Sequence, residues 1–91
     1  MRVALHPVTN MLTVGHRKVR LAPKQANMLW MLMSRHVCTR AELIAGLYSP
    51  SYIPETIADC IRAYAYRLNL ALSGSSWVVR AVRIGYQLVA L

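Results

Sequence analysis

Acidic residues are scarce in this chain: 3 Asp and Glu stand against 11 Lys and Arg in 91 residues, so the net charge is +8. Phenylalanine is absent. No uncharged stretch supplies the roughly 18 consecutive apolar residues that a membrane-spanning helix requires. Residues 1–7 also lack a long apolar segment followed by a small-residue cleavage site, which a signal peptide would contain. We therefore expect no membrane segment and a cytoplasmic location.

Side chains that could form a catalytic or metal site are few and scattered. The two cysteines, Cys38 and Cys60, could form one disulfide, but in a small hydrophobic intracellular chain we expect them to be buried free thiols. His36 and Cys38 are an isolated pair, and the chain has neither a carboxylate pair nor a nucleophile beside a base. We expect no enzymatic activity, no metal and no cofactor.

What the chain does have is apolar side chains and positive charge. Hydrophobic residues make up 56% of the sequence and are spread along it, which predicts one folded domain over residues 1–91 with a single core. A net charge of +8 that no local acidic run neutralises favours a polyanionic partner. Nucleic acid is the leading candidate because counterion release drives its binding, with acidic protein and anionic lipid as alternatives.

The first half of the chain predicts a small sheet followed by a helix. Residues 3–21 are rich in β-branched and apolar residues, and residues 11–21 are typical of two strands around a turn at Gly15. Pro23 suits a first helical position, and apolar residues recur at helical spacing over 23–34. We expect an N-terminal sheet over 3–21 and a helix over 23–34.

Two more helices and a hairpin follow. Thr39-Arg40-Ala41-Glu42 is a capping box, which predicts a second helix over about 40–48. Two prolines make residues 49–54 a loop, and a third helix is expected over 55–72. Residues 77–90 predict two closing strands, and we expect Gly85 to supply the tight turn of this hairpin. Sheet, three helices and hairpin, in that order, predict an α+β winged helix-turn-helix fold.

Four segments resemble the DNA-binding effector domain of OmpR/PhoB-type response regulators. Residues 21–32 (LAPKQANMLWML) are similar to the family's LTPxExxLLxxL, and residues 38–44 (CTRAELI) to vSReeLl. Residues 66–72 (YRLNLAL) resemble RRLRKxL, and residues 81–88 (AVRIGYQL) resemble TVRGxGYxL. The resemblance covers about residues 12–90. It implies sequence-specific binding of double-stranded DNA and transcription regulation.

The chain departs from the family pattern at several positions. Ala22 replaces the Thr that caps the first helix, so a side-chain acceptor is lost there. Asn69 stands where the family has an arginine. At the hairpin tip, matching Gly85-Tyr86 puts Arg83 on a family glycine, whereas a tip shorter by one residue puts it on the family arginine. The sequence leaves both registers open.

The winged-helix interpretation predicts which side chains contact DNA. A single helix fits the major groove, so the face of 55–72 opposite the core is the expected base-contacting surface, with the hairpin at the adjacent minor groove. For each position, a solvated side chain without a DNA contact is the alternative. The candidate residues are Arg62, Tyr66, Arg67 and Asn69 on the third helix, Arg83 and its reserve Arg80 on the hairpin, and Lys24 and Arg40 as phosphate contacts.

No receiver domain is visible in the sequence, so we expect either an excised effector domain or a stand-alone regulator, such as a phage or accessory transcription factor. RNA polymerase and a second copy of the chain on DNA are further candidate partners. The alternative function is a winged-helix protein-interaction module, with loop 49–54 and the apolar Leu70 as its contact surface.

Overall fold

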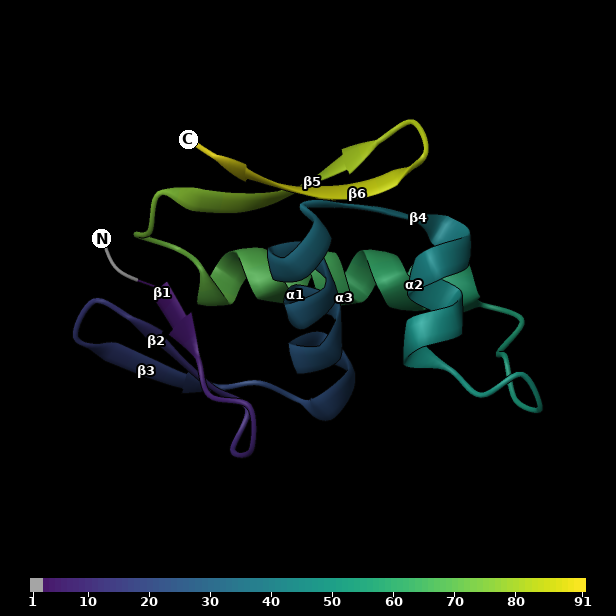
Figure 1. The fold of residues 1–91 in the computed structure, drawn as a ribbon, viewed down its shortest axis with the longest axis horizontal. Helices are drawn as coiled ribbons and strands as arrows, with labels where there is room; N and C mark the ends of the chain where they lie inside the picture. Colours follow the sequence, from purple (N-terminus) through teal and green to yellow (C-terminus); the bar gives the residue numbers. More distant parts are fainter. Residues whose placement is uncertain (1–2) are drawn as a thin grey trace.

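The computed structural model describes residues 3–91, which form three helices and two small antiparallel sheets (Figure 1). The N-terminal sheet has the order β1-β2-β3, with β1 over Val3–Leu5, β2 over Met11–Val14 and β3 over Arg17–Arg20. Side chains alternate between the faces of a strand, and this places Leu12 and Val14 in the core and Met11 and Thr13 toward the outside. The predicted N-terminal sheet is confirmed, with β1 as an additional strand.

The three helices are α1 (Pro23–Arg35), α2 (Arg40–Leu47) and α3 (Ile57–Ala71). Helix α3 is shorter than the expected 55–72, because residues 55 and 56 form a turn and Thr56 makes no side-chain capping bond. The helices and β2 form the core through side chains that are almost wholly buried. The largest of these are Leu12, Met28, Leu29, Leu32, Leu43, Leu68 and Leu72.

The C-terminal sheet has the order β4-β6-β5, with β5 over Trp77–Val82 and β6 over Gly85–Ala90. Its third strand, β4 (Val37–Thr39), was not predicted. Three residues carry too little pattern to identify a strand, and this one is defined by its distant partners, such as Tyr86 opposite Cys38. The strand joins α1 to α2 and anchors the hairpin over the helices.

The hairpin turn is formed by Arg83 and Ile84, and the role of Gly85 differs from the expectation. Val82 pairs with Gly85, so the turn consists of Arg83 and Ile84, and Arg83 occupies the first turn position. We expected Gly85 to supply the tight turn, but Gly85 lies in β6 and is not among the glycines with positive φ. A Cβ atom there would collide with the carbonyl oxygen of Cys38. The glycine instead permits the close approach of β6 to β4.

The helix N-termini follow the capping expectations. Glu42 N donates to Thr39 Oγ1 at 3.1 Å, and Thr39 N donates to the Glu42 carboxylate at 2.9 Å, which completes the capping box of α2. Hydrogen bonds from Thr39 to the carboxylate, together with nearby Arg35, lower the pKa of Glu42. At α1, Ala22 offers no side-chain acceptor, and its backbone N–H donates to Gln25 Oε1 at 3.3 Å. Within residues 3–91, no helix combines the length and apolarity needed to cross a membrane.

Candidate nucleic-acid interface

One face of α3 packs on the core and the other is open to solvent. Ile61, Ala65 and Leu68 are buried at helical spacing. On the opposite face the Tyr66 side chain is 65% exposed and Leu70 is 56% exposed. The exposed residues of this face, which we call the α3 outer face, are Ala58, Asp59, Arg62, Ala63, Tyr66, Arg67 and Leu70.

Arg62 lies near the middle of the α3 outer face and is paired with Asp59 one turn earlier. The guanidinium and carboxylate are 3.3 Å apart, and their side chains are 74% and 71% exposed. An exposed pair of this kind contributes little stability because water screens both charges. Arg62 can therefore exchange Asp59 for a stronger anion at small cost.

The structure corrects the expectation for Asn69. Its amide nitrogen donates to Val79 O at 2.8 Å, and its amide oxygen accepts from Val79 N at 2.7 Å. The side chain is partly buried between α3 and β5, and both of its polar groups bond the backbone of the hairpin. Asn69 thus joins helix to hairpin, and both of its amide groups already have backbone partners.

Lys24 is also placed differently from the expectation of a phosphate contact. Its Nζ donates to Leu47 O at 2.8 Å, at the C-terminus of α2, and lies 4.4 Å from the centre of the Tyr48 ring. A cation at this end of a helix satisfies a free carbonyl and the helix dipole. The lysine stabilises the end of α2 instead of extending toward a ligand.

Arg17 has the same kind of role for α3, and no local sequence pattern predicts it. Its guanidinium donates to Ala71 O at 3.0 Å and to Ser73 O at 2.6 Å. Arg17 is 54 residues from Ala71 in sequence, so only the folded arrangement of β3 beside α3 reveals the contact. A depression beside Arg17 lies between α3 and the N-terminal sheet, and its lining includes Arg20, Arg67 and Leu70. Its arginines extend the basic surface past the end of α3.

Two of the candidate cations, Arg40 and Arg62, lie near the N-terminal half of α3. Arg40, in the first turn of α2, and Arg62 line one depression of about 160 Å³, together with Tyr86 of β6. Ile44, Ile57 and Ile61 form part of its apolar lining. Arg40 of α2 and Arg62 of α3 therefore border the same depression, although 22 positions separate them in the sequence.

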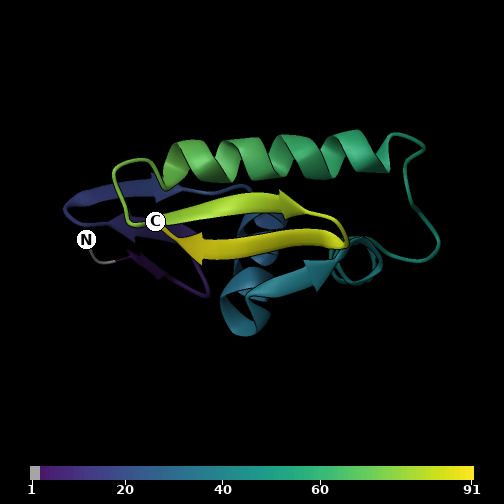
Figure 2. The ribbon, with the colours of Figure 1, turned by 90° about the horizontal axis from the view of Figure 1, so that it is seen from above.

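The hairpin carries two exposed arginines, Arg80 on β5 and Arg83 in the turn. Figure 2 shows β5 running alongside α3, with the hairpin turn directed toward the end where α3 begins. Arg83 thus lies at the tip, where Ile84 is 55% exposed beside it. Helix and hairpin tip project as two neighbouring elements, as the winged-helix interpretation requires.

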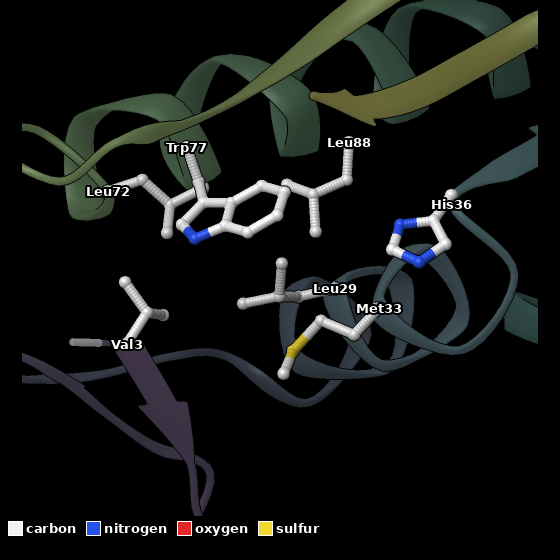
Figure 3. Close-up of a pocket in the computed structure, with 7 residues that line it drawn as sticks. All are labelled: Val3, Leu29, Met33, His36, Leu72, Trp77 and Leu88. Carbon is white, nitrogen blue, oxygen red and sulfur yellow. The ribbon is translucent and has the colours of Figure 1, made fainter. Parts of the chain in front are cut away.

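An apolar cavity of about 170 Å³ lies away from these cations, between the N-terminal sheet, α1 and the hairpin (Figure 3). Leu29 and Met33 of α1 and Trp77 and Leu88 of the hairpin line it, with His36 as its one polar side chain. Trp77 packs partly buried against the core. The cavity offers no cluster of charges for an anion.

The expectation of free thiols holds for both cysteines, of which Cys38 is buried and Cys60 is partly exposed on α3. Burial raises the pKa of the Cys38 thiol. Across residues 3–91, no group of three or more His, Cys, Asp and Glu side chains is close enough to hold a metal ion. The polar chemistry of the described surface is therefore mainly that of arginine.

Comparison with known proteins gives matches at the level of structure. No family model and no curated protein matches the sequence. The DNA-binding domain of Bacillus subtilis CssR superimposes with a TM-score of 0.79 at 12% identity, covering 97% of this chain and 100% of that domain. The DNA-binding domain of E. coli CadC has a TM-score of 0.75 at 20% identity, covering 98% of this chain and 87% of that one.

A third solved structure is the DNA-binding domain of the response regulator AdeR in complex with an intercistronic region. It has a TM-score of 0.72 at 16% identity, and the match covers 98% of this chain and 95% of that domain. The order of sheet, three helices and hairpin is thus shared over nearly the whole length of all three domains. The resemblance to OmpR/PhoB-type effector domains is confirmed at the level of the fold: this chain is a winged helix-turn-helix.

Proposed function

We propose that this protein is a sequence-specific transcriptional regulator that binds double-stranded DNA, with α3 in the major groove and the β5–β6 hairpin at the adjacent minor groove. The observation that carries the proposal is the α3 outer face, on which Arg62, Tyr66 and Arg67 are exposed beside a hairpin that ends in Arg83. An exposed helix face that carries arginines suits the major groove, which admits one helix. The AdeR domain of the same fold was solved with DNA, which supports the proposal.

The chemistry of each side chain suggests its role. Arg62 can contact a guanine with two hydrogen bonds once it leaves Asp59, and Tyr66 can contact a phosphate or a thymine methyl group. Arg40 and Arg67 lie on either side of the central residues and are assigned to phosphates. Arg83, with Arg80 behind it, is assigned to the minor groove. Asn69 and Lys24 are left out because their polar groups already bond the protein backbone.

The test is the salt dependence of binding to a labelled duplex. A protein that neutralises several phosphates loses affinity steeply as salt rises, and each lost phosphate contact reduces the slope of log K against log salt by about 1. We expect Arg67→Ala to weaken binding and flatten this slope, with the thermal midpoint of unfolding nearly unchanged. Lys18→Ala is the matched control, because it removes one positive charge from the outer face of the N-terminal sheet, opposite Thr13.

The outcomes separate the possibilities. Failure of a mixed-sequence duplex to bind even at low salt contradicts the DNA proposal. Equal loss of affinity in the two variants would mean that net charge alone matters and that α3 is not the contact element. Selection of bound fragments from random DNA, followed by footprinting, then gives the operator. The spacing of its half-sites reports whether two copies bind together.

A second candidate function, a protein-interaction module, is supported by an apolar groove between α2 and the loop that follows it. Ala41, Ala45 and Tyr48 of this groove face Pro50 and Ile53. The side chain of Ile53 is 47% exposed, and that of Tyr52 nearby is 71% exposed. RNA polymerase or another regulator is the proposed partner. This surface lies on different residues from the α3 outer face, so the two functions are compatible.

A further inference from the structure

The strand β5 is an edge of the C-terminal sheet, so half of its peptide groups cannot bond a neighbouring strand. In an antiparallel pair, residues alternate between those whose N–H and C=O point toward the partner and those whose groups point away. Leu91 N donates to Ser76 O, so the peptide groups of Ser76 point toward β6. Every second residue of β5 has the same orientation, so those of Trp77, Val79 and Ala81 point outward, away from β6. The two hydrogen bonds between the Asn69 side chain and the Val79 backbone confirm this orientation independently.

Two of these three outward positions are covered by side chains. Ser75 Oγ accepts from Trp77 N at 3.1 Å and lies 3.2 Å from Trp77 O, to which it donates. Asn69 covers both groups of Val79, at 2.8 Å and 2.7 Å. Ala81 is exposed, and within residues 3–91 no group accepts from its N–H. The open position is the one nearest the hairpin tip.

We propose that the Ala81 N–H is a phosphate-binding donor of the DNA interface. This inference rests on the proposed function and adds a backbone group to it. When α3 occupies the major groove and the hairpin tip the adjacent minor groove, the phosphate strand between the two grooves must pass between helix and hairpin. The outward edge of β5 faces this space, because Asn69 reaches the same edge from α3 two residues earlier.

The chemistry of the position suits a phosphate. Backbone N–H groups commonly contact phosphate oxygens and set the register of a protein on the duplex. Arg80 and Arg83 flank Ala81 in sequence and add positive charge near it. Asn69 acts as a positioning residue, because its two bonds set how far β5 lies from α3 and so fix the width available to the phosphate strand.

Ala81→Pro tests the proposal because it removes this one donor. Proline is tolerated in edge strands where its nitrogen faces outward, and the bonds between β5 and β6 do not use the Ala81 N–H. Ala81→Val keeps the donor and is the matched control. We expect Ala81→Pro to weaken duplex binding by about tenfold or more, the effect of one lost hydrogen bond to a charged acceptor. The salt slope should stay parallel to that of the unchanged protein, since no cation is removed.

The salt slope distinguishes this donor from its neighbours, because Arg80→Ala should flatten the slope instead. Should Ala81→Pro fail to fold, an amide-to-ester substitution at the same bond removes the donor without the proline ring, and binding is measured on that protein. Unchanged affinity in the folded proline or ester protein overturns the inference while leaving the proposed function intact. Failure of the unchanged protein to bind any duplex at low salt overturns the proposed function itself.

Discussion

The two halves of α3 differ in the polar contacts that fix them to the rest of the protein. The C-terminal half is fastened on two sides, by Asn69 to the β5 backbone and by Arg17 to the carbonyls of Ala71 and Ser73. The N-terminal half begins without a side-chain cap, and its one described ion pair is the exposed Asp59–Arg62 contact. The helix is therefore anchored at its end and open at its start.

This difference explains how one short helix can serve both fold and ligand. Asn69, in the anchored half, has both polar groups bonded to the hairpin backbone, so it contributes to stability. Polar side chains in the open half have weak or exchangeable partners, and DNA can replace these partners at little cost. Variants of buried or backbone-bonded side chains should therefore change stability, whereas variants of exposed side chains should change binding with little change in stability.

The largest expected effect is on the buried side of the anchored half. Leu68 is fully buried between the helices, so Leu68→Ala removes apolar contacts and leaves a cavity. We expect the free energy of unfolding to fall by about 2–5 kcal/mol, measured by urea denaturation followed by circular dichroism. Leu70→Ala is the control, because Leu70 is 56% exposed and should change stability by less than about 0.5 kcal/mol. Similar losses in both variants would contradict the assignment of the two faces.

A smaller effect is expected where α3 is joined to the hairpin. Asn69→Ala leaves the N–H and C=O of Val79 without their partner, at a cost of about 1–3 kcal/mol. We expect a lower thermal midpoint together with weaker duplex binding, because the hairpin loses its fixed distance from α3. The double variant with Arg83→Ala measures the link: if Asn69 positions the hairpin, losing Arg83 should cost less affinity in the Asn69→Ala background than in the unchanged protein. Strict additivity would show that Asn69 serves stability alone.

The same contrast marks what the sequence could predict. Periodicity and capping located the helices, because Thr39 and Glu42 lie close together in the chain and their bonds are local. The apolar spacing of α3 separated its buried face from its outer face, so Arg62, Tyr66 and Arg67 were correctly placed at the surface. These features depend on neighbours within one or two helical turns.

The bonds that side chains make to distant backbone groups could not be predicted from the sequence. Asn69 and Lys24 have polar groups of the kind that contact DNA, and only the folded chain shows that Val79 and Leu47 occupy those groups. The role of Gly85 depends on β4, a strand that exists through its pairing with β6. A sequence pattern reports which side chains face outward, whereas the partner of an outward polar group is decided by the tertiary fold.

The smallest effect on stability, and the clearest on binding, is expected in the open half. Asp59→Asn removes a negative charge beside Arg62, and because the pair is exposed, we expect the free energy of unfolding to change by less than about 0.5 kcal/mol. Duplex binding should tighten severalfold at low salt, since repulsion from phosphate is lost and Arg62 no longer has to leave a partner; the gain should shrink as salt screens the charges. Glu55→Gln removes an equal charge from the turn before α3 and is the control. Tighter binding only in Asp59→Asn would place the DNA against the open half of the helix, whereas equal gains would reflect net charge alone.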